Sequence, residues 1–211
     1  RFNFSIESGE QTVMLAEPGV ERQIALLLKR HVNPDTGLLT IGGSDLGSFD
    51  MYLLRSAVVV LNRPSIVDVT IREYLNMAAG GDADSAVIIK VLDIVGLTTR
   101  ISSLPKGLDT QLASSGSPLS ILEVMQLKAA TALISRPKVL LLSQLYDMMP
   151  DGPLQATLRM LREQGTTVLL FTGRPEAVHL DSCYWLGATT QHRFTDTAAL
   201  TRFLVEKEAQ A

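Results

Sequence analysis

Two short apolar runs in the C-terminal half of the chain constrain its fold most strongly. Val139 to Leu142 and Thr167 to Phe171 have the length and composition of buried strands, and a helical segment, Pro153 to Gln164, lies between them. Strand, helix and strand in this order are typical of a parallel α/β unit. A third apolar run, Ala57 to Leu61, is interpreted as another buried strand. The sequence therefore predicts an α/β fold.

Turn residues and hydrophobic periodicity divide the rest of the chain. Strands are predicted at Phe2 to Ile6, Gln11 to Ala16 and Tyr184 to Leu186, and a hairpin-like piece at Leu38 to Gly43. Helices are predicted at Ile24 to His31, Val69 to Ala78, Ser85 to Val95, Leu119 to Ile134 and Thr197 to Lys207. Because the pattern from about Asp68 to Leu133 changes to helices linked by polar loops, we expect a helical subdomain at about residues 68–134 within a single domain spanning residues 1–211.

Composition excludes several classes of protein. The chain has 211 residues, 46% hydrophobic, and a net charge of −3 from 19 basic and 22 acidic residues, which argues against a nucleic-acid partner. A single cysteine, Cys183, forms no intrachain disulfide, and we interpret it as a buried packing residue. No apolar stretch approaches the roughly 18 residues of a membrane span, so a soluble domain is expected. The chain begins at Arg1 without an initiator Met and resembles a fragment of a longer protein.

Several separate segments carry a family resemblance. The clearest are Asn33 to Gly37 with the following Ile41 to Leu46, then Val67 to Glu73, Leu104 to Thr110 and Arg136 to Lys138. In this order they resemble the exporter branch of ABC transporter nucleotide-binding domains over nearly the whole chain. The resemblance implies a P-loop NTPase (RecA-like) core, an ABC-type helical subdomain and a truncated antiparallel β subdomain at the start of the chain.

The position of the phosphate-binding loop departs from the family pattern. A P-loop reads G-x-x-x-x-G-K-[ST], and its backbone N–H groups hold phosphates at a helix N-terminus. This chain has Ala16 to Gln23 there, in which only Gly19 remains of the loop glycines. Glu21 replaces the last glycine, Arg22 the lysine, and Gln23 the hydroxyl that binds magnesium. The loop is either an ordinary strand-to-helix turn or a modified phosphate site.

The other catalytic positions are also changed. By the resemblance, Ser143 and Gln144 occupy the places of the Walker B aspartate and of the glutamate that activates water, Asn62 that of the Q-loop glutamine, and Gly173 that of the switch histidine. Gln144 could still orient a water if a metal were bound. Asp147 keeps the D-loop position, whereas His31, His179 and His192 match no family position.

The signature motif, L-S-G-G-Q in the family, corresponds to Leu119, Ser120, Ile121, Leu122 and Glu123. Both glycines are replaced by branched residues, and Glu123 adds a negative charge where phosphate would approach backbone N–H groups. Ser120 is predicted to cap the following helix.

These departures predict a degenerate, catalytically inactive nucleotide-binding domain that acts as a structural or regulatory component of an export system. One alternative is the degenerate ATP-binding half of a heterodimeric exporter, and another is an active ATPase with unusual residues. No cofactor is expected, with ATP and magnesium the candidates if a site is retained. The expected partners are a transmembrane domain, fused or separate, docking around Asn62 to Asp68, and a second nucleotide-binding domain. The domain would be cytoplasmic and attached peripherally to the cell membrane through the transmembrane partner.

Overall fold

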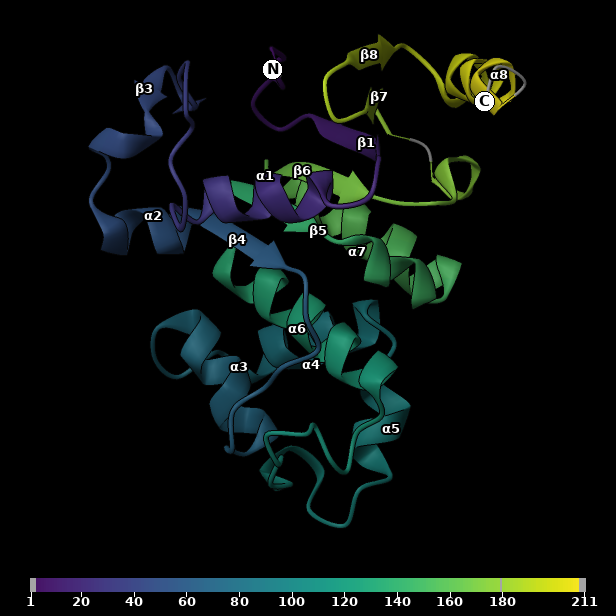
Figure 1. Ribbon diagram of the computed structural model, residues 1–211. Coiled ribbons are helices and arrows are strands. Elements are labelled where there is room, and N and C mark those ends of the chain that lie inside the picture. Colours follow the sequence, from purple (N-terminus) through teal and green to yellow (C-terminus); the bar gives the residue numbers. More distant parts are fainter. Residues whose placement is uncertain (1–2, 179, 209–211) are drawn as a thin grey trace. The chain divides into compact units, whose positions relative to one another are not determined.

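The computed structural model describes residues 3–178 and 180–208, which form two compact units (Figure 1). The first, here called the core unit, contains the described parts of Arg1–Val60, Pro137–Asp147 and Gly165–Ala211. The second, the helical unit, contains Leu61–Arg136 and Met148–Gln164. Among the described residues, no helix is long and apolar enough to cross a membrane.

A six-stranded sheet forms the centre of the core unit. Its strand order is β4-β5-β6-β1-β7-β8, with bounds β1 Gln11–Ala16, β4 Val58–Leu61, β5 Val139–Leu142, β6 Thr167–Phe171, β7 Ser182–Leu186 and β8 Gln191–Phe194. β5 pairs with β6, β6 with β1 and β1 with β7, all in parallel, whereas β8 runs antiparallel to β7. In this register Val13 of β1 lies between Leu170 of β6 and Cys183 of β7. The predicted parallel α/β fold is confirmed.

Burial explains the apolar composition of the central strands. All five residues of β6 and all five of β7 are buried, so both faces of these strands are covered and polar alternation is absent. Cys183 is buried here as predicted, and burial raises the pKa of its thiol.

Two helices pack against one face of the sheet in the core unit. They are α1, Val20–Leu28, and α2, Met51–Ala57. Ile24 and Leu28 of α1 and Leu54 of α2 join a hydrophobic cluster with sheet residues that include Met14 and Phe171. Asp50 caps α2: its carboxylate accepts hydrogen bonds from the N–H groups of Tyr52 and Leu53, the second and third residues of the helix. The sequence did not predict α2.

A small hairpin confirms the predicted turn at Gly42 and Gly43. β2, Thr40–Ile41, pairs antiparallel with β3, Ser44–Asp45. Both glycines have positive φ angles, 58° and 79°, which a tight turn between two-residue strands requires. Short 3-10 helices elsewhere in the chain are η1 Leu46–Ser48, η2 Gly107–Asp109, η3 Gln144–Met148 and η4 Pro175–Ala177.

The helical unit is built around α6, Ile121–Ser135. The other helices of this unit are α3 Ile71–Ala79, α4 Ser85–Ile94, α5 Thr98–Ser102 and α7 Asp151–Glu163. α3, α4 and α7 each contact α6, and most of its side chains from Val124 to Leu133 are buried. The one buried amide among them, Gln126, donates a hydrogen bond of 2.7 Å to the carbonyl of Val95. A helix enclosed on several sides in this way is apolar around most of its circumference.

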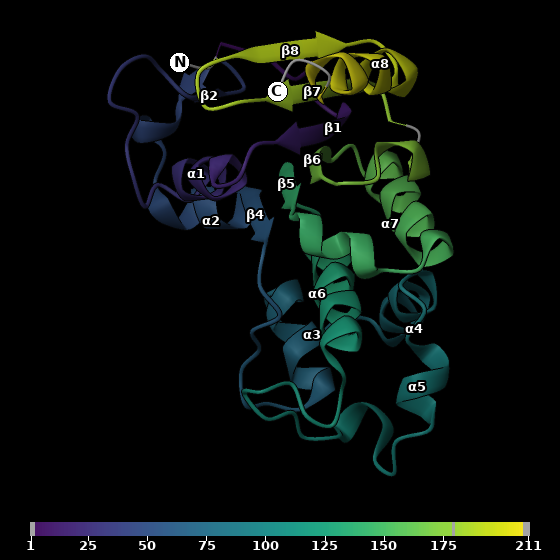
Figure 2. The ribbon, with the colours of Figure 1, turned by 45° about the vertical axis from the view of Figure 1, so that its right-hand side comes forward.

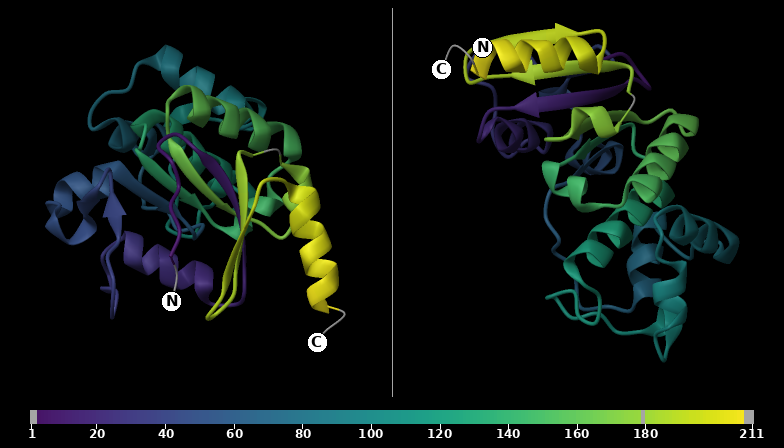
Figure 3. Two further views of the ribbon diagram at one scale, coloured as in Figure 1. Left: turned by 90° about the horizontal axis from the view of Figure 1, so that it is seen from above. Right: turned by 90° about the vertical axis from the view of Figure 1, so that its right-hand side faces the viewer.

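The C-terminal segment lies along the edge of the sheet. α8, Thr197–Glu208, contacts both β7 and β8 (Figures 2 and 3). Phe203 of α8 packs against Trp185 and Phe194, with ring centroids 5.4 and 5.3 Å apart. Aromatic packing therefore fixes α8 to the last two strands.

One predicted strand is wrong. Residues 3–6 form no strand in the described part of the chain, and Phe2 and His179 lie outside it. The backbone here bonds to side chains instead: the Gln191 Oε1 atom accepts from the N–H of Asn3, and the hydroxyl of Tyr184 donates to the carbonyl of Ser5. Among the strands of the described residues, the antiparallel pairs are β2 with β3 and β7 with β8.

Candidate functional site

The turn between β1 and α1 presents the N-terminus of α1 at the carboxyl end of the sheet (Figure 1). Gly19 precedes the helix with a φ of 90°, in the left-handed region that favours glycine. Its carbonyl accepts from the N–H of Gln23, and the carbonyl of Glu17 accepts from the N–H of Val20. Gly19, the N-cap residue, has no side chain with which to cap the helix. A strand-to-helix turn of this shape can bind an anion, because its N–H groups point out of the helix end.

Glu21, in the first turn of α1, places its own carboxylate in this region. The side chain is half-buried, and its Oε2 accepts a hydrogen bond of 3.2 Å from the backbone N–H of Gln144, directly after β5. Burial raises the pKa of Glu21, the hydrogen bond from Gln144 opposes that change, and the charge of Asp147 adds to it. Arg22 and Gln23 are exposed on the next positions of the helix.

The end of β5 carries two uncharged side chains. Ser143 is 1% exposed, and in the part of the chain that the structure describes its Oγ has no hydrogen-bond partner. Gln144 is exposed, and its side-chain amide lies beside Gly173, which follows β6. Because β5 and β6 are neighbouring parallel strands, the residues after them meet at the same edge of the sheet.

Asp147 organises the turn after β6. Its Oδ1 accepts from the Thr172 hydroxyl at 2.5 Å, and its Oδ2 accepts from the Gly173 N–H at 2.8 Å. The guanidinium of Arg174 donates to the backbone carbonyl of Asp147. Asp147, which the resemblance assigns to the D-loop, is thus hydrogen-bonded to residues 172–174. By the same resemblance this segment would carry the switch histidine.

The remaining predicted positions lie in the helical unit. Asn62 is half-buried in an irregular segment after β4. Ser120 caps α6 as predicted: its Oγ accepts from the N–H of Glu123 at 3.3 Å, and the Glu123 carboxylate accepts from the N–H of Ser120 at 2.7 Å. Glu123 also pairs with Arg100 at 3.1 Å. Leu119 is buried, Leu122 is half-buried, and Ile121 is 60% exposed.

The predicted site residues thus fall into two sets. The core unit brings together Gly19, Glu21, Arg22, Gln23, Ser143, Gln144 and Gly173 at one edge of the sheet. Asn62 and residues 119–123 belong to the helical unit. No local sequence pattern pointed to Thr172 and Arg174, because their contacts with Asp147 depend on the pairing of β5 with β6.

The donor atoms at this edge do not suit magnesium. Mg²⁺ prefers carboxylate and phosphate oxygens, and Ser143 and Gln23 offer a neutral hydroxyl and a neutral amide. The nearest carboxylates, Glu21 and Asp147, are bonded to backbone N–H groups. Among the described residues, no cluster of three His, Cys, Asp or Glu side chains could hold a metal ion.

The parallel sheet, the glycine turn after β1 and the helix that follows it define the fold of an ABC exporter nucleotide-binding domain, with a P-loop NTPase core. The solved structure of a bacterial Atm1-family ABC exporter with ATP bound matches this fold with a TM-score of 0.77 and 24% identity, over 92% of this chain and 35% of that one.

Sequence relatives are ABC transporters. ABC transporter B family member 21 of Arabidopsis thaliana is 30% identical over 142 residues, which cover 66% of this chain and 11% of that protein. ATP-binding cassette sub-family B member 10, mitochondrial, of Mus musculus is 29% identical over 182 residues, 82% of this chain and 25% of that protein. The chain therefore spans about a quarter or less of these two relatives. No model of a known protein family matches the sequence.

Proposed function

We propose that this chain is the nucleotide-binding domain of an ABC exporter whose own phosphate site does not hydrolyse ATP, and that it serves as a structural or regulatory component. The observation that carries the proposal is the hydrogen bond between the carboxylate of Glu21 and the backbone N–H of Gln144. It places an anionic group of the chain itself at the helix N-terminus that would have to receive the phosphates.

Electrostatics supports this reading. A phosphate approaching α1 meets a half-buried carboxylate, and Asp147 lies close enough to raise the pKa of that carboxylate. Two like charges at about 4 Å repel each other by roughly 4 kcal/mol at an effective dielectric constant of 20. Arg22 is exposed and carries the only cation among the three replaced loop residues, so its charge compensates only in part.

The site also lacks the side chains that usually catalyse ATP hydrolysis. A general base must accept a proton from the attacking water, and the side chain of Gln144 has no basic group. Ser143 has no anionic oxygen for magnesium. An orienting role for Gln144 would require a bound metal, which these donors do not favour.

The same proposal extends to the partners. A transmembrane domain would dock around Asn62 to Asp68, where Val67 is 46% exposed. A second nucleotide-binding domain would face the start of α6, where Ile121 is exposed and Glu123 is already engaged by Ser120 and Arg100. An intact partner site that borrowed this segment would meet a carboxylate and branched side chains in place of glycines.

Calorimetric titration of the purified domain with ATP, with and without magnesium, tests the proposal. We expect no magnesium-dependent binding in the micromolar range and no phosphate release. Micromolar magnesium-dependent binding together with turnover would contradict it. If hydrolysis occurs only after an intact nucleotide-binding domain is added, the chain is instead the degenerate half of a heterodimeric exporter.

A further inference from the structure

Glu17 joins three parts of the core unit at the turn before α1. Its backbone N–H donates to the carbonyl of Leu186 at 2.8 Å, and its carbonyl accepts from the N–H of Val20, the first residue of α1, at 3.1 Å. Its Oε2 accepts from the N–H of Ala188 at 2.9 Å, in the turn between β7 and β8. The start of α1 is therefore tied to the β7–β8 turn through one residue.

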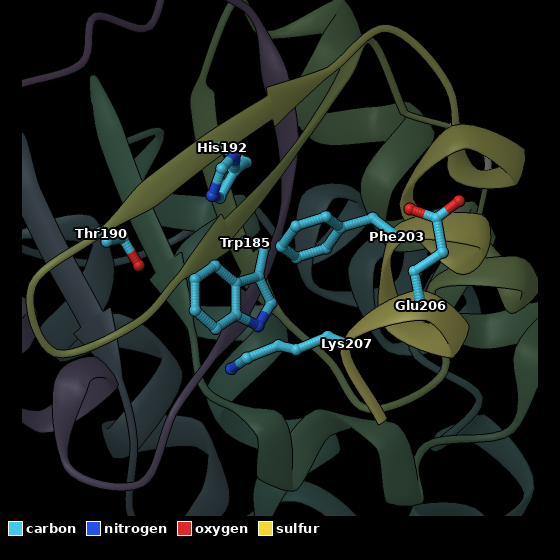
Figure 4. A pocket seen from close by; sticks show the side chains of 6 residues that line it. All are labelled: Trp185, Thr190, His192, Phe203, Glu206 and Lys207. Atoms are coloured by element: carbon cyan, nitrogen blue, oxygen red, sulfur yellow. The ribbon is translucent and has the colours of Figure 1, made fainter. Parts of the chain in front are cut away.

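The fourth contact of Glu17 comes from the C-terminal helix. Nζ of Lys207, near the end of α8, lies 2.9 Å from Oε1 of Glu17. The same ammonium lies 3.8 Å from the centroid of the Trp185 ring, toward which it points in Figure 4. Lys207 is thus held by a carboxylate and by the face of an aromatic ring at once.

Aromatic side chains surround this contact. Trp185 is only 6% exposed, and Phe203, one turn before Lys207 on α8, packs against Trp185 and His192 with centroid distances of 5.4 and 4.7 Å. These rings line a shallow concavity of about 240 Å³. Because Lys207 of the same chain already lies over the Trp185 ring, the concavity is the seat of an intramolecular contact and not an open cation site.

We propose that α8 acts as a strap on the turn before α1: through Lys207 it holds Glu17, and through Glu17 it holds the hydrogen bonds that order the start of α1. A partner or modification that lifts α8 would release Lys207 and loosen this turn. The device couples the C-terminal helix to the former phosphate loop. It does not depend on whether nucleotide binds there, so it stands or falls separately from the proposed function.

The expected effect is modest because both partners are partly exposed. The side chains of Glu17 and Lys207 are 37% and 43% exposed. Ion pairs of this kind change local equilibria about two- to fivefold. Hydrogen exchange measures such local opening directly, since an amide exchanges only when its hydrogen bond opens.

The test compares amide hydrogen exchange of the nucleotide-free chain with that of three variants. In Lys207→Gln the charge is lost, in Lys207→Arg it is kept, and Glu206→Gln changes the neighbouring residue, whose carboxylate points away from Trp185 (Figure 4). We expect the amides of Glu17, Val20 and Ala188 to exchange about two to five times faster in Lys207→Gln, while the other two variants match the unaltered chain. Amides of β1 and β6 serve as the internal reference for folding.

Two further measurements sharpen the result. Glu17→Gln combined with Lys207→Gln should exchange no faster than Glu17→Gln alone, since the two changes remove the same contact. High salt should reduce the difference between the unaltered chain and Lys207→Gln. Each of three results would contradict the proposal. These are unchanged exchange in Lys207→Gln, equally faster exchange in Glu206→Gln, and faster exchange that includes the amides of β1 and β6.

Discussion

The side-chain amide of Gln144 occupies the space beside Gly173: a Cβ atom added at Gly173 would lie 2.7 Å from Nε2 of Gln144. The sequence resemblance assigns these two residues to the positions of the catalytic glutamate and the switch histidine. They meet because each follows one of two adjacent parallel strands, β5 and β6. The structure therefore brings the two residues together at the carboxyl end of the sheet.

The side chains beside two glycines predict different costs for replacing each with alanine. Gly173→Ala should be tolerated, whereas Gly187→Ala should not. The obstacle at Gly173 is the free end of an exposed side chain, which can rotate away, so we expect a loss of less than about 1 kcal/mol. At Gly187 the added Cβ would lie 2.4 Å from Cη2 of Trp185, a rigid and buried ring, and we expect a loss of about 1–3 kcal/mol. Neither glycine has a positive φ, so urea unfolding of the two variants compares steric effects alone. Equal losses would contradict this account.

Asp147 is expected to stabilise the turn after β6. Asp147→Ala removes the acceptor of the Thr172 hydroxyl and of the Gly173 N–H. We expect a loss of about 1–3 kcal/mol in the free energy of unfolding, because donors that lose their partner are costly when partly buried. Asp35→Ala, in the exposed turn at residues 33–37, is the matched control and should change the free energy by less than about 0.5 kcal/mol. A loss at Asp147 no larger than at Asp35 would show that the network contributes nothing.

The sequence was sufficient for the elements with strong local signals. The parallel strands β5 and β6 are short, mostly apolar runs that are largely buried. The helices α3, α4 and α6 are preceded by polar capping residues. The capping role of Ser120 followed from the same logic. The residues at the carboxyl ends of β5 and β6 could be placed together once those strands were predicted to be parallel neighbours.

Other features depend on contacts that no local pattern encodes. The segment at residues 3–6 has strand-like composition but bonds to side chains of β7 and β8 instead of a neighbouring strand. α2 was missed because its seven residues bury only Leu54 and therefore show little periodicity. The ion pair of Glu17 with Lys207 joins opposite ends of the sequence, and only the packing of α8 on β7 brings them together.

Glu21 should make stability depend on pH in the opposite sense to Glu73. Burial raises the pKa of Glu21 in the folded chain. Its favourable contribution to the free energy of unfolding is therefore present below the pKa of Glu21 in the unfolded chain, and it is lost as pH rises through the folded-state pKa. We expect Glu21→Gln to be more stable than the unaltered chain at pH 7, by less than about 1 kcal/mol because the side chain is half-hydrated, with the difference vanishing near pH 4.

The comparison with Glu73 provides the control for this titration. Hydrogen bonds from Thr70 in the capping box of α3 lower the pKa of Glu73. Its contribution is therefore present above the unfolded pKa and is lost as pH falls through the folded one, so Glu73→Gln should be less stable at pH 7. Urea midpoints measured for both variants from pH 4 to pH 7 decide the matter. A Glu21→Gln variant that is less stable than the unaltered chain at pH 7 would contradict the assigned direction.

Restoring the family residues should restore nucleotide binding if the frame of the site is intact. The variant Glu21→Gly, Arg22→Lys, Gln23→Ser and Ser143→Asp removes the internal carboxylate and supplies a compact ammonium, a hydroxyl and an anionic oxygen for magnesium. Gly19 already has the left-handed φ that the turn needs, and β1, β5 and β6 already have the parallel register. We expect magnesium-dependent ATP binding at least about tenfold tighter than in the unaltered chain, which is roughly 1.4 kcal/mol.

The matched control for this variant is the same set of substitutions with Ser143 left unchanged. Without the new carboxylate, magnesium has no anionic protein ligand at the end of β5, so ATP binding should no longer depend on magnesium. Hydrolysis should stay absent in both variants because Gln144 has no basic group. If the four-substitution variant unfolds cooperatively in urea like the unaltered chain and still does not bind ATP, the loss of binding lies elsewhere than in these four residues. The segment of the helical unit from Asn62 to Asp68 would then be the next to test.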